Sequence, residues 1–233
     1  MKILIAVSSC SRFEENHQSM RDTWLPEAEK LGIEHRFFVE AGGKTSSDTV
    51  VTEHEDWAMT SRLKDKVGWA YQSGFDFVFS CFPDTYVRSD RLLACGFEKY
   101  DYSGFFHEQT PLGEIAKEDY KCTFKTTAGY GIERKLYNWA DGGDGRMLSR
   151  RAAEAIVASQ DAAYWLAADD IFIGQVLGPM ITTGDIKAWN MGYHKDDIPD
   201  NGYTWHHKSY PEHANTQYDP ATKWMNKMYE EKQ

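Results

Sequence analysis

The chain has 233 residues, of which 41% are hydrophobic and 27% are charged, and this length suffices to bury a substantial core. Its formal net charge is −10 at pH 7, and it contains no block of basic residues, so the composition argues against nucleic acid as a partner. No apolar run approaches the ~20 residues of a membrane-spanning helix, and we expect no membrane span.

The four cysteines, at positions 10, 81, 95 and 122, show neither the C-x-x-C spacing nor the spacing of zinc ligands. A reducing compartment is the simpler interpretation, although the spacing leaves a disulfide open. The N-terminal apolar run, residues 3–7, is too short for a secretory signal peptide. We therefore expect a cytoplasmic protein.

The first predicted strand covers residues 2–8, a continuous apolar run that ends in small polar residues. Residues 14–31 follow with a helical pattern, which Pro26 is expected to split. A second strand is predicted for residues 33–39. The polar segment 41–49, rich in glycine, serine and threonine, is predicted to be a loop.

A second helix is predicted for residues 54–73, where apolar side chains recur with a period of about 3.6 residues. The aromatic and β-branched run 75–82 has the composition of a buried strand. Pro83 and Asp84 end that strand in a turn, and Ser89 is expected to cap a short helix. This alternation predicts a parallel sheet with crossover helices, and Asp84 would lie at its carboxyl edge, where ligands collect in such sheets.

The patterns in the second half are weaker. A strand is predicted for residues 102–107, whereas residues 111–126 show no clear pattern. The glycine cluster of residues 140–149 (ADGGDGRMLS) precedes a predicted helix, residues 150–159. The cluster is either a plain turn with a helix N-cap or a place where the backbone approaches a ligand closely. It does not match a phosphate-binding loop.

Two adjacent carboxylates, Asp169 and Asp170, precede an apolar helical run that ends near Gly178. The dipole of a helix stabilises acidic residues at its N-terminus, so a capped helix is one explanation for this pair and a catalytic role is the other.

Residues 181–189 are predicted to form a late strand and residues 218–231 a terminal amphipathic helix. The loop-like segment 190–210 between them contains His194, His206 and His207. No internal repeat, low-complexity tract or linker interrupts the chain, so residues 1–233 are predicted to form a single domain.

Four blocks of sequence, in this order, resemble the family of animal β-1,3-galactosyltransferases, β-1,3-N-acetylglucosaminyltransferases and Fringe. Residues 8–25 include Arg12, Arg21 and Thr23-Trp24-Leu25, and residues 56–87 include a lysine-bearing helix and the strand before Asp84. The other two blocks are GGDGRMLS at residues 142–149 and DDIFIG at residues 169–174. The likeness spans roughly residues 3–210.

The resemblance implies an α/β fold of the GT-A type, with a mixed, mainly parallel central sheet flanked by helices. It implies an inverting glycosyltransferase that moves a hexose or N-acetylhexosamine from a nucleotide sugar, expected to be a UDP-sugar, to a hydroxyl group of a glycan or glycoconjugate. It places these residues at the donor pocket: Ser8, Arg12, Arg21, Lys64, Asp84 and Gly143.

A diphosphate leaving group needs its developing charge neutralised, usually by Mn²⁺ or Mg²⁺. Asp84 stands where the last residue of the family's Asp-Asp-Asp motif stands. His206 or His207 falls where a metal-binding histidine is expected, and imidazole suits Mn²⁺ better than Mg²⁺. An inverting displacement also needs a base for the acceptor hydroxyl. The resemblance assigns that role to Asp170, with Asp169 second.

The chain departs from the family where Phe82-Pro83-Asp84 replaces Asp-Asp-Asp, and three explanations stay open. Asp84, a histidine, the diphosphate and water could hold the metal ion. Catalysis could be metal-independent, with Arg88 or Lys64 meeting the charge. The chain could also have lost activity and only bind a sugar or nucleotide. The retention of Asp84 and of the pair Asp169-Asp170 favours the first explanation.

Two other functions are alternatives. A non-catalytic carbohydrate- or nucleotide-binding module would account for the two missing aspartates. A viral enzyme that glycosylates modified DNA bases is the other, and the acidic net charge argues against it. The family's animal members carry a membrane anchor, whereas this chain begins at its first strand. We therefore expect a microbial or viral relative that works in the cytoplasm, which for a virus is that of the host.

Overall fold

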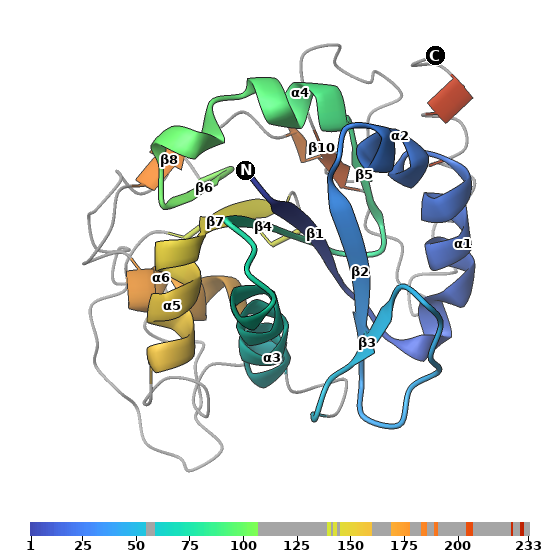
Figure 1. Ribbon diagram of the computed structural model, residues 1–233, viewed down its shortest axis with the longest axis horizontal. Helices are drawn as coiled ribbons and strands as arrows, with labels where there is room; N and C mark the ends of the chain where they lie inside the picture. Colours follow the sequence, from blue (N-terminus) through green and yellow to red (C-terminus); the bar gives the residue numbers. More distant parts are fainter. Residues whose placement is uncertain are drawn as a thin grey trace.

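The computed structural model describes residues 1–54, 59–106, 139–140, 142–143, 145–159, 169–177, 183–185, 189–190, 204–206, 225 and 229–230. Within these ranges, helices cover both faces of a seven-stranded sheet (Figure 1). No helix in the same ranges combines the length and the hydropathy that a membrane span requires. Segment 111–126 and most of the predicted loop 190–210 and helix 218–231 lie outside the described residues.

The strands of the central sheet lie in the order β3-β2-β1-β4-β7-β6-β8. Strands β3, β2, β1 and β4 are mutually parallel. Strand β7 runs antiparallel to both β4 and β6, and β6 is parallel to β8. The predicted mixed, mainly parallel sheet is therefore confirmed. The bounds are β1 Ile3–Ser8, β2 Glu34–Val39, β3 Thr49–Val51, β4 Phe77–Cys81, β6 Tyr102–Gly104, β7 Arg146–Ser149 and β8 Thr183–Asp185.

The side chains of β1 alternate between two hydrophobic cores, one on each face of the sheet. Ile3, Ile5 and Val7 pack in the core beneath α1 (Glu14–Asp22) and α2 (Leu25–Lys30). Leu4 and Ala6 pack in the core beneath α3 (Met59–Gln72), α5 (Arg150–Ala158) and α6 (Asp169–Leu177). Burial on both faces explains why the sequence of β1 is apolar throughout rather than alternating.

A second, three-stranded sheet has the order β5-β10-β9. Its strands are β5 (Thr85–Val87), β9 (Trp189–Asn190) and β10 (Thr204–His206). Strand β5 begins directly after Asp84 and pairs antiparallel with β10. Neither β5 nor β10 was expected from the sequence, because strands of three residues are too short to give a periodic pattern.

Most of the predicted elements are present, and Pro26 stands in the first turn of α2, so the helix is split as expected. The glycine cluster, however, contains the buried strand β7, whereas the sequence predicted either a turn with a helix N-cap or a close approach of the backbone to a ligand. The cap itself is confirmed, since Ser149 Oγ accepts a hydrogen bond from the Ala152 N–H at 3.2 Å.

Three boundaries differ from those predicted. Strand β3 occupies the end of the predicted loop, because its backbone pairs with the edge of β2. His54 lies in a bend before α3, where it contacts Asp65 at 2.8 Å, and not in the helix. Ser89 is the first residue of α4 (Ser89–Ala94) and not its cap, a position that Arg88 occupies. Two short 3₁₀ helices complete the described elements, η1 (Ser11–Phe13) and η2 (Phe97–Lys99).

We expect Gly145→Ala to lower the free energy of unfolding by about 2–5 kcal/mol, the sum of a left-handed backbone and overpacking. Gly145 has φ +82°, and a Cβ atom at this position would lie 2.2 Å from Phe79 Cζ. Gly74→Ala is the matched control, because its φ is +77° but no atom lies within 4 Å of the added Cβ. Urea unfolding would measure both, and equal losses would contradict the close packing of β7 on Phe79.

Candidate functional site

The carboxyl ends of β1 and β4 meet at one edge of the sheet, because the two strands are adjacent and parallel (Figure 1). Lys66 of α3 ties these ends together: its Nζ donates to Ser8 Oγ and, at 2.7 Å, to Ser80 Oγ. The Lys66 side chain is 1% exposed. Burial lowers the pKa of Lys66 to about 7, although Asp169 acts in the opposite direction.

Arg62, one turn before Lys66 on α3, fixes the neighbouring backbone. Its guanidinium donates to the carbonyl oxygen of Ser9 and, at 2.9 Å, to that of Phe38. Two buried cations of one helix thus hold the ends of β1, β2 and β4 in place. The sequence analysis missed both residues. Their i, i+4 spacing beside Leu63 and Val67 was the available signal, since it puts both cations on the edge of the apolar face of α3.

The turn after β4 presents Asp84, whose side chain is buried. Asn16 of α1 donates to the Pro83 carbonyl oxygen at 3.3 Å. Thr85 Oγ1 accepts from the Phe82 N–H at 3.3 Å and donates to the Gly143 carbonyl oxygen at 3.0 Å. The glycine-rich segment is therefore attached to the residue next to Asp84.

Arg146 connects the start of α6 to the same edge. It stands opposite Ser80 in the β4–β7 pairing, and its Nη2 forms an ion pair with Asp169 Oδ2. Both side chains are buried, 1% and 6% exposed respectively. A Cβ atom on Gly142 would lie 3.1 Å from Arg146 Nη1, so the glycine lets the backbone pass directly over the guanidinium. The sequence analysis missed this role of Arg146.

These contacts bring together several of the predicted site residues. Ser8 is linked through Lys66 to Ser80, Gly143 through Thr85 to the Asp84 turn, and Asp169 through Arg146 to β4. Asp170, the next residue of α6, is only partly buried. The arrangement places acidic groups of β4 and α6 and the end of β1 at one edge of the sheet.

Of the two predicted histidine ligands, one belongs to the second sheet and the other lies outside the described residues. In the β5–β10 pairing, His206 stands opposite Thr85, so its backbone lies one residue along from Asp84. His207 and His194 are outside the described residues. No group of three or more His, Cys, Asp or Glu side chains suited to a metal ion occurs within the described part of the chain. Asp84 alone would supply a described side-chain ligand.

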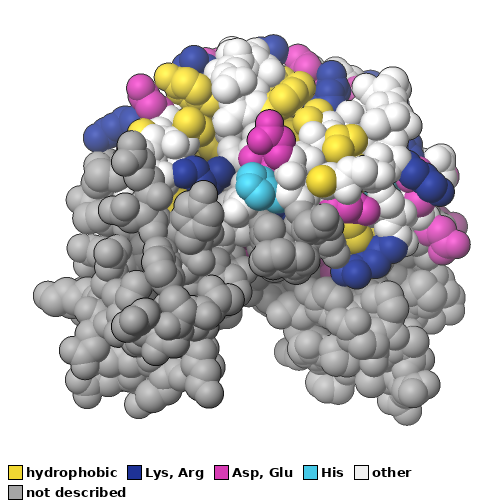
Figure 2. Space-filling view, turned by 90° about the horizontal axis from the view of Figure 1, so that it is seen from below, with side chains coloured by type: hydrophobic (Ala, Val, Ile, Leu, Met, Phe, Trp, Pro, Cys, Tyr) yellow, Lys and Arg dark blue, Asp and Glu magenta, His cyan; other side chains and the backbone are white. Residues whose placement is uncertain are grey.

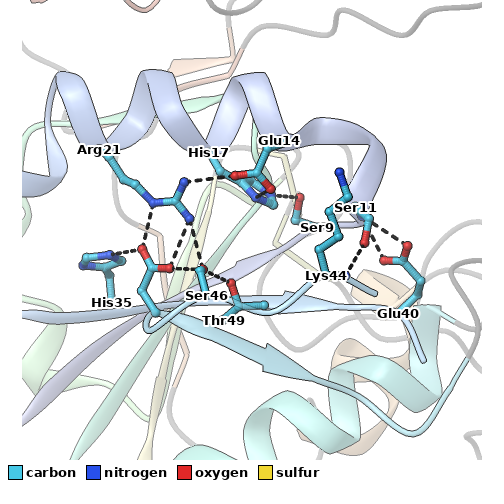
Figure 3. A network of polar contacts seen from close by, with 11 residues as sticks. Ser9, Ser11, Glu14, His17, Arg21, His35, Glu40, Lys44, Ser46 and Thr49 are labelled. Carbon is cyan, nitrogen blue, oxygen red and sulfur yellow. Dashed lines mark hydrogen bonds and ion pairs between the residues drawn. The ribbon is translucent and has the colours of Figure 1, made fainter. Parts of the chain in front are cut away.

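Arg21 makes its contacts away from this cluster, in a network that joins α1 to the segment before β3 and to His35 near the start of β2 (Figure 3). Its guanidinium binds Asp48 at 2.8 and 3.1 Å and lies over the Phe37 ring. Burial would raise the pKa of Asp48, but hydrogen bonds from Arg21, Ser46 and His35 hold it well below its usual range. These contacts stabilise the α1–β2 region, and the role of Arg21 at the donor pocket stays a prediction.

Two other predicted residues also have contacts outside the cluster. Lys64 donates to the carbonyl oxygen of Ser159 at the end of α5. Arg12 is exposed and its guanidinium lies 5.0 Å from the centre of the Phe13 ring. Arg12 belongs to η1, which follows β1 after two residues, so it still lies near the carboxyl edge. The donor-binding roles of Lys64 and Arg12 stay predictions.

Hydrogen bonds and a stacking contact fix the loop between β1 and α1. Ser9 Oγ and His17 Nε2 share a hydrogen bond (Figure 3). The His17 ring stacks on Phe37, with the ring centroids 4.3 Å apart. Burial lowers the pKa of His17 to about 4, so the imidazole is neutral near pH 7. The Ser11 N–H donates to the Glu40 carboxylate at 3.0 and 3.2 Å. The backbone that begins at Ser8 is therefore fixed before any ligand arrives.

The face seen in Figure 2 carries acidic and basic side chains intermixed on its described surface. They form no continuous basic patch over the atoms that this view describes. A mixed surface of this kind does not supply the row of phosphate contacts on which duplex binding depends.

Comparisons with known proteins establish the fold. No protein-family model and no curated protein matches the sequence. The galactosyltransferase LgtC, solved with donor and acceptor sugar analogues, is similar with a TM-score of 0.50 at 11% identity, over 99% of this chain and 96% of that one. The inositol-1-phosphate CTP transferase from T. maritima gives a TM-score of 0.50 at 10% identity, over 98% and 96%. The chain has the GT-A-type fold that these two transferases share, as predicted.

Proposed function

We propose that the protein is an inverting glycosyltransferase that moves a hexose or N-acetylhexosamine from a UDP-sugar to a hydroxyl group of a glycan or glycoconjugate. The observation that carries the proposal is the convergence of Asp84, Gly143 and the Asp169-Asp170 pair on the carboxyl edge of β1 and β4. Ligands of open α/β sheets bind at this edge. The resemblance to β-1,3-glycosyltransferases assigns donor and acceptor roles to these same residues.

Asp170 is our candidate for the general base. A base must reach the acceptor hydroxyl from solvent-accessible space, and Asp170 is only partly buried. Asp169 is buried and its carboxylate is already engaged by Arg146, so it is less accessible to an acceptor hydroxyl. The structure therefore favours Asp170 over Asp169 for this role. Deprotonation of the acceptor oxygen by Asp170 would accompany its attack on the anomeric carbon, opposite the departing UDP.

Asp84 is our candidate ligand for Mn²⁺ or Mg²⁺. The carboxylate belongs to the turn at the end of β4, and carboxylate oxygens are ligands that both ions accept. The backbone of His206 pairs with Thr85, the residue after Asp84, and His206 stays a predicted ligand. When bound, such an ion neutralises charge on a diphosphate leaving group. Phe82 and Pro83 supply no ligands, so the diphosphate and water would complete the shell.

The proposal is tested by calorimetric titration of UDP into the protein with and without Mn²⁺, repeated on Asp84→Asn. We expect Mn²⁺ to tighten UDP binding by about 10-fold or more, and Asp84→Asn to abolish that gain, because the amide loses the anionic ligand. Asp90→Asn is the matched control, since Asp90 is an exposed acid paired with Arg88 at the start of α4. It should bind UDP as the wild type does.

Three other results would contradict the proposal in different ways. Tight UDP binding indifferent to Mn²⁺ and to Asp84→Asn would exclude the metal site and favour a metal-independent enzyme. Binding of UDP-sugars without any release of UDP, even to water, would indicate a binding module. Binding of CTP with release of pyrophosphate would indicate a nucleotidyltransferase, and the inositol-1-phosphate CTP transferase from T. maritima is a structure of this fold.

A further inference from the structure

The hydrogen bonds of Lys66 determine which way two serine hydroxyls point. A protonated lysine amine has three N–H donors and no acceptor. Its contacts with Ser8 Oγ and Ser80 Oγ therefore oblige both serine oxygens to accept. Each serine must then direct its own O–H toward another group. Lys66 thus turns both hydroxyls into hydrogen-bond donors.

The two serines differ in what they can reach. Ser80 is 2% exposed within β4, so its hydroxyl proton stays inside the protein. Ser8 is partly exposed as the last residue of β1, so its O–H can meet a ligand at the sheet edge. A hydroxyl whose oxygen already accepts from an ammonium group is a strengthened donor, and its best acceptor is an anionic oxygen such as that of a phosphate.

We propose that Lys66 is a positioning residue of the diphosphate site, because its two hydrogen bonds orient the Ser8 hydroxyl toward a phosphate oxygen of the donor. The inference rests on the proposed function for the identity of the ligand. It adds a role that the resemblance does not give, because the resemblance points to Lys64, two residues earlier on the same helix.

The electrostatic environment of Lys66 adds an expected consequence, which is that diphosphate binding takes up a proton at this residue. The groups that face Lys66 are Arg62 of its own helix, Arg146 of β7, Asp169 of α6 and Cys81 of β4. Burial outweighs the favourable effect of Asp169 and brings the Lys66 pKa to about 7, so above neutral pH much of the amine is uncharged in the free protein. A diphosphate bound to the Ser8 hydroxyl would place negative charge close to Lys66, which favours the ammonium form and raises this pKa. Binding must then consume protons and weaken as pH rises above about 7.

Lys64 offers the sharpest comparison on the same helix. Its Nζ contacts the Ser159 carbonyl oxygen at the end of α5, on the side of α3 that packs against another helix. Lys66 contacts the ends of two strands instead. Replacing each lysine by methionine keeps an unbranched stem out to the ε position and removes the charged donor, so the pair of variants separates the two assignments.

The experiment is isothermal titration of UDP and of inorganic pyrophosphate, at about pH 6 and about pH 8, in two buffers of different ionisation enthalpy. For the wild type we expect proton uptake at the higher pH, with binding about 10-fold weaker there than at the lower pH. Lys66→Met should lose about 10-fold or more in affinity at the lower pH and show no Lys66-dependent uptake. Ser8→Ala should weaken both ligands comparably.

Lys66→Arg separates positioning from a merely structural role. A guanidinium stays protonated across this range, so the variant should bind at the higher pH at least as well as the wild type and take up no proton. A residue that only supported the fold would not convert a pH-dependent affinity into a pH-independent one. If Lys66→Met melts early, Lys66→Arg and Ser8→Ala carry the same test.

Several outcomes overturn the proposal. They are unchanged affinity and proton uptake in Lys66→Met, loss of binding in Lys64→Met but not in Lys66→Met, and failure of the wild type to bind either ligand. Failure of the proposed function looks different. If pyrophosphate binds with the expected dependence on Lys66 and UDP binds no tighter than pyrophosphate, the result supports the diphosphate site and contradicts the nucleotide-sugar donor.

Discussion

Replacing Asp169 by alanine is expected to lower the free energy of unfolding by about 3–5 kcal/mol, which is the usual cost of breaking one half of a buried ion pair. The variant leaves the Arg146 guanidinium, only 1% exposed, without its carboxylate. It also leaves Arg146 near Lys66, a second buried cation. The loss should appear in urea unfolding at neutral pH as a lower midpoint with an unchanged slope.

Two further variants show whether the pair itself is responsible. Arg146→Met should cost less than Asp169→Ala, because Asp169 then keeps the favourable charge of Lys66. Arg146→Met combined with Asp169→Leu should recover part of the loss, since apolar replacements of a buried pair are often well tolerated. Asp170→Asn removes an acid from the same helix terminus and should cost only about 0.3–1 kcal/mol. A loss in Asp169→Ala no larger than this would contradict the buried pair.

The sequence predicted the elements whose pattern is carried by many consecutive residues. Strand β1 is apolar because both of its faces are buried, and α1 and α2 are separated because proline tolerates only the first turn of a helix. Strand β7 escaped notice for the opposite reason. It has four residues, follows a glycine and begins with Arg146. A short segment that contains a charged residue resembles a loop in sequence, because the partner that buries the charge is not visible there.

The candidate site was predictable only where it lies at the ends of apolar runs. Asp84 and Asp169 each adjoin such a run, so strand and helix ends marked them. The contacts that assemble the site are long-range: Lys66 reaches Ser8 across 58 positions and Arg146 reaches Asp169 across 23. No local pattern encodes such pairs. Lys64 was assigned to the donor pocket by the resemblance alone, and only the long-range contacts distinguish it from Lys66, since Lys64 reaches Ser159 and Lys66 reaches Ser8.

Asp170→Asn is expected to reduce sugar transfer by about 10²–10⁴-fold, the range that a general base contributes, while UDP affinity changes little. The amide has the same size as the carboxylate at this partly buried position, so the fold is retained. The rate of transfer falls because the proton of the acceptor hydroxyl is no longer removed. Release of UDP from UDP-galactose, UDP-glucose and UDP-N-acetylglucosamine, with and without free sugars as acceptors, would measure the rate.

Asp90→Asn, at the exposed first turn of α4, is the control for loss of one acidic charge at a helix start, and it should retain the full rate. Asp170→Glu should restore part of the activity, because it returns a carboxylate with a shifted reach. The rate of the wild type should fall at acidic pH as its base is protonated, and Asp170→Asn should lack that limb. An Asp170→Asn rate within a few-fold of the wild type would move the base to another residue. Asp169 is buried and its carboxylate is engaged by Arg146, so the search would then turn to residues beyond α6.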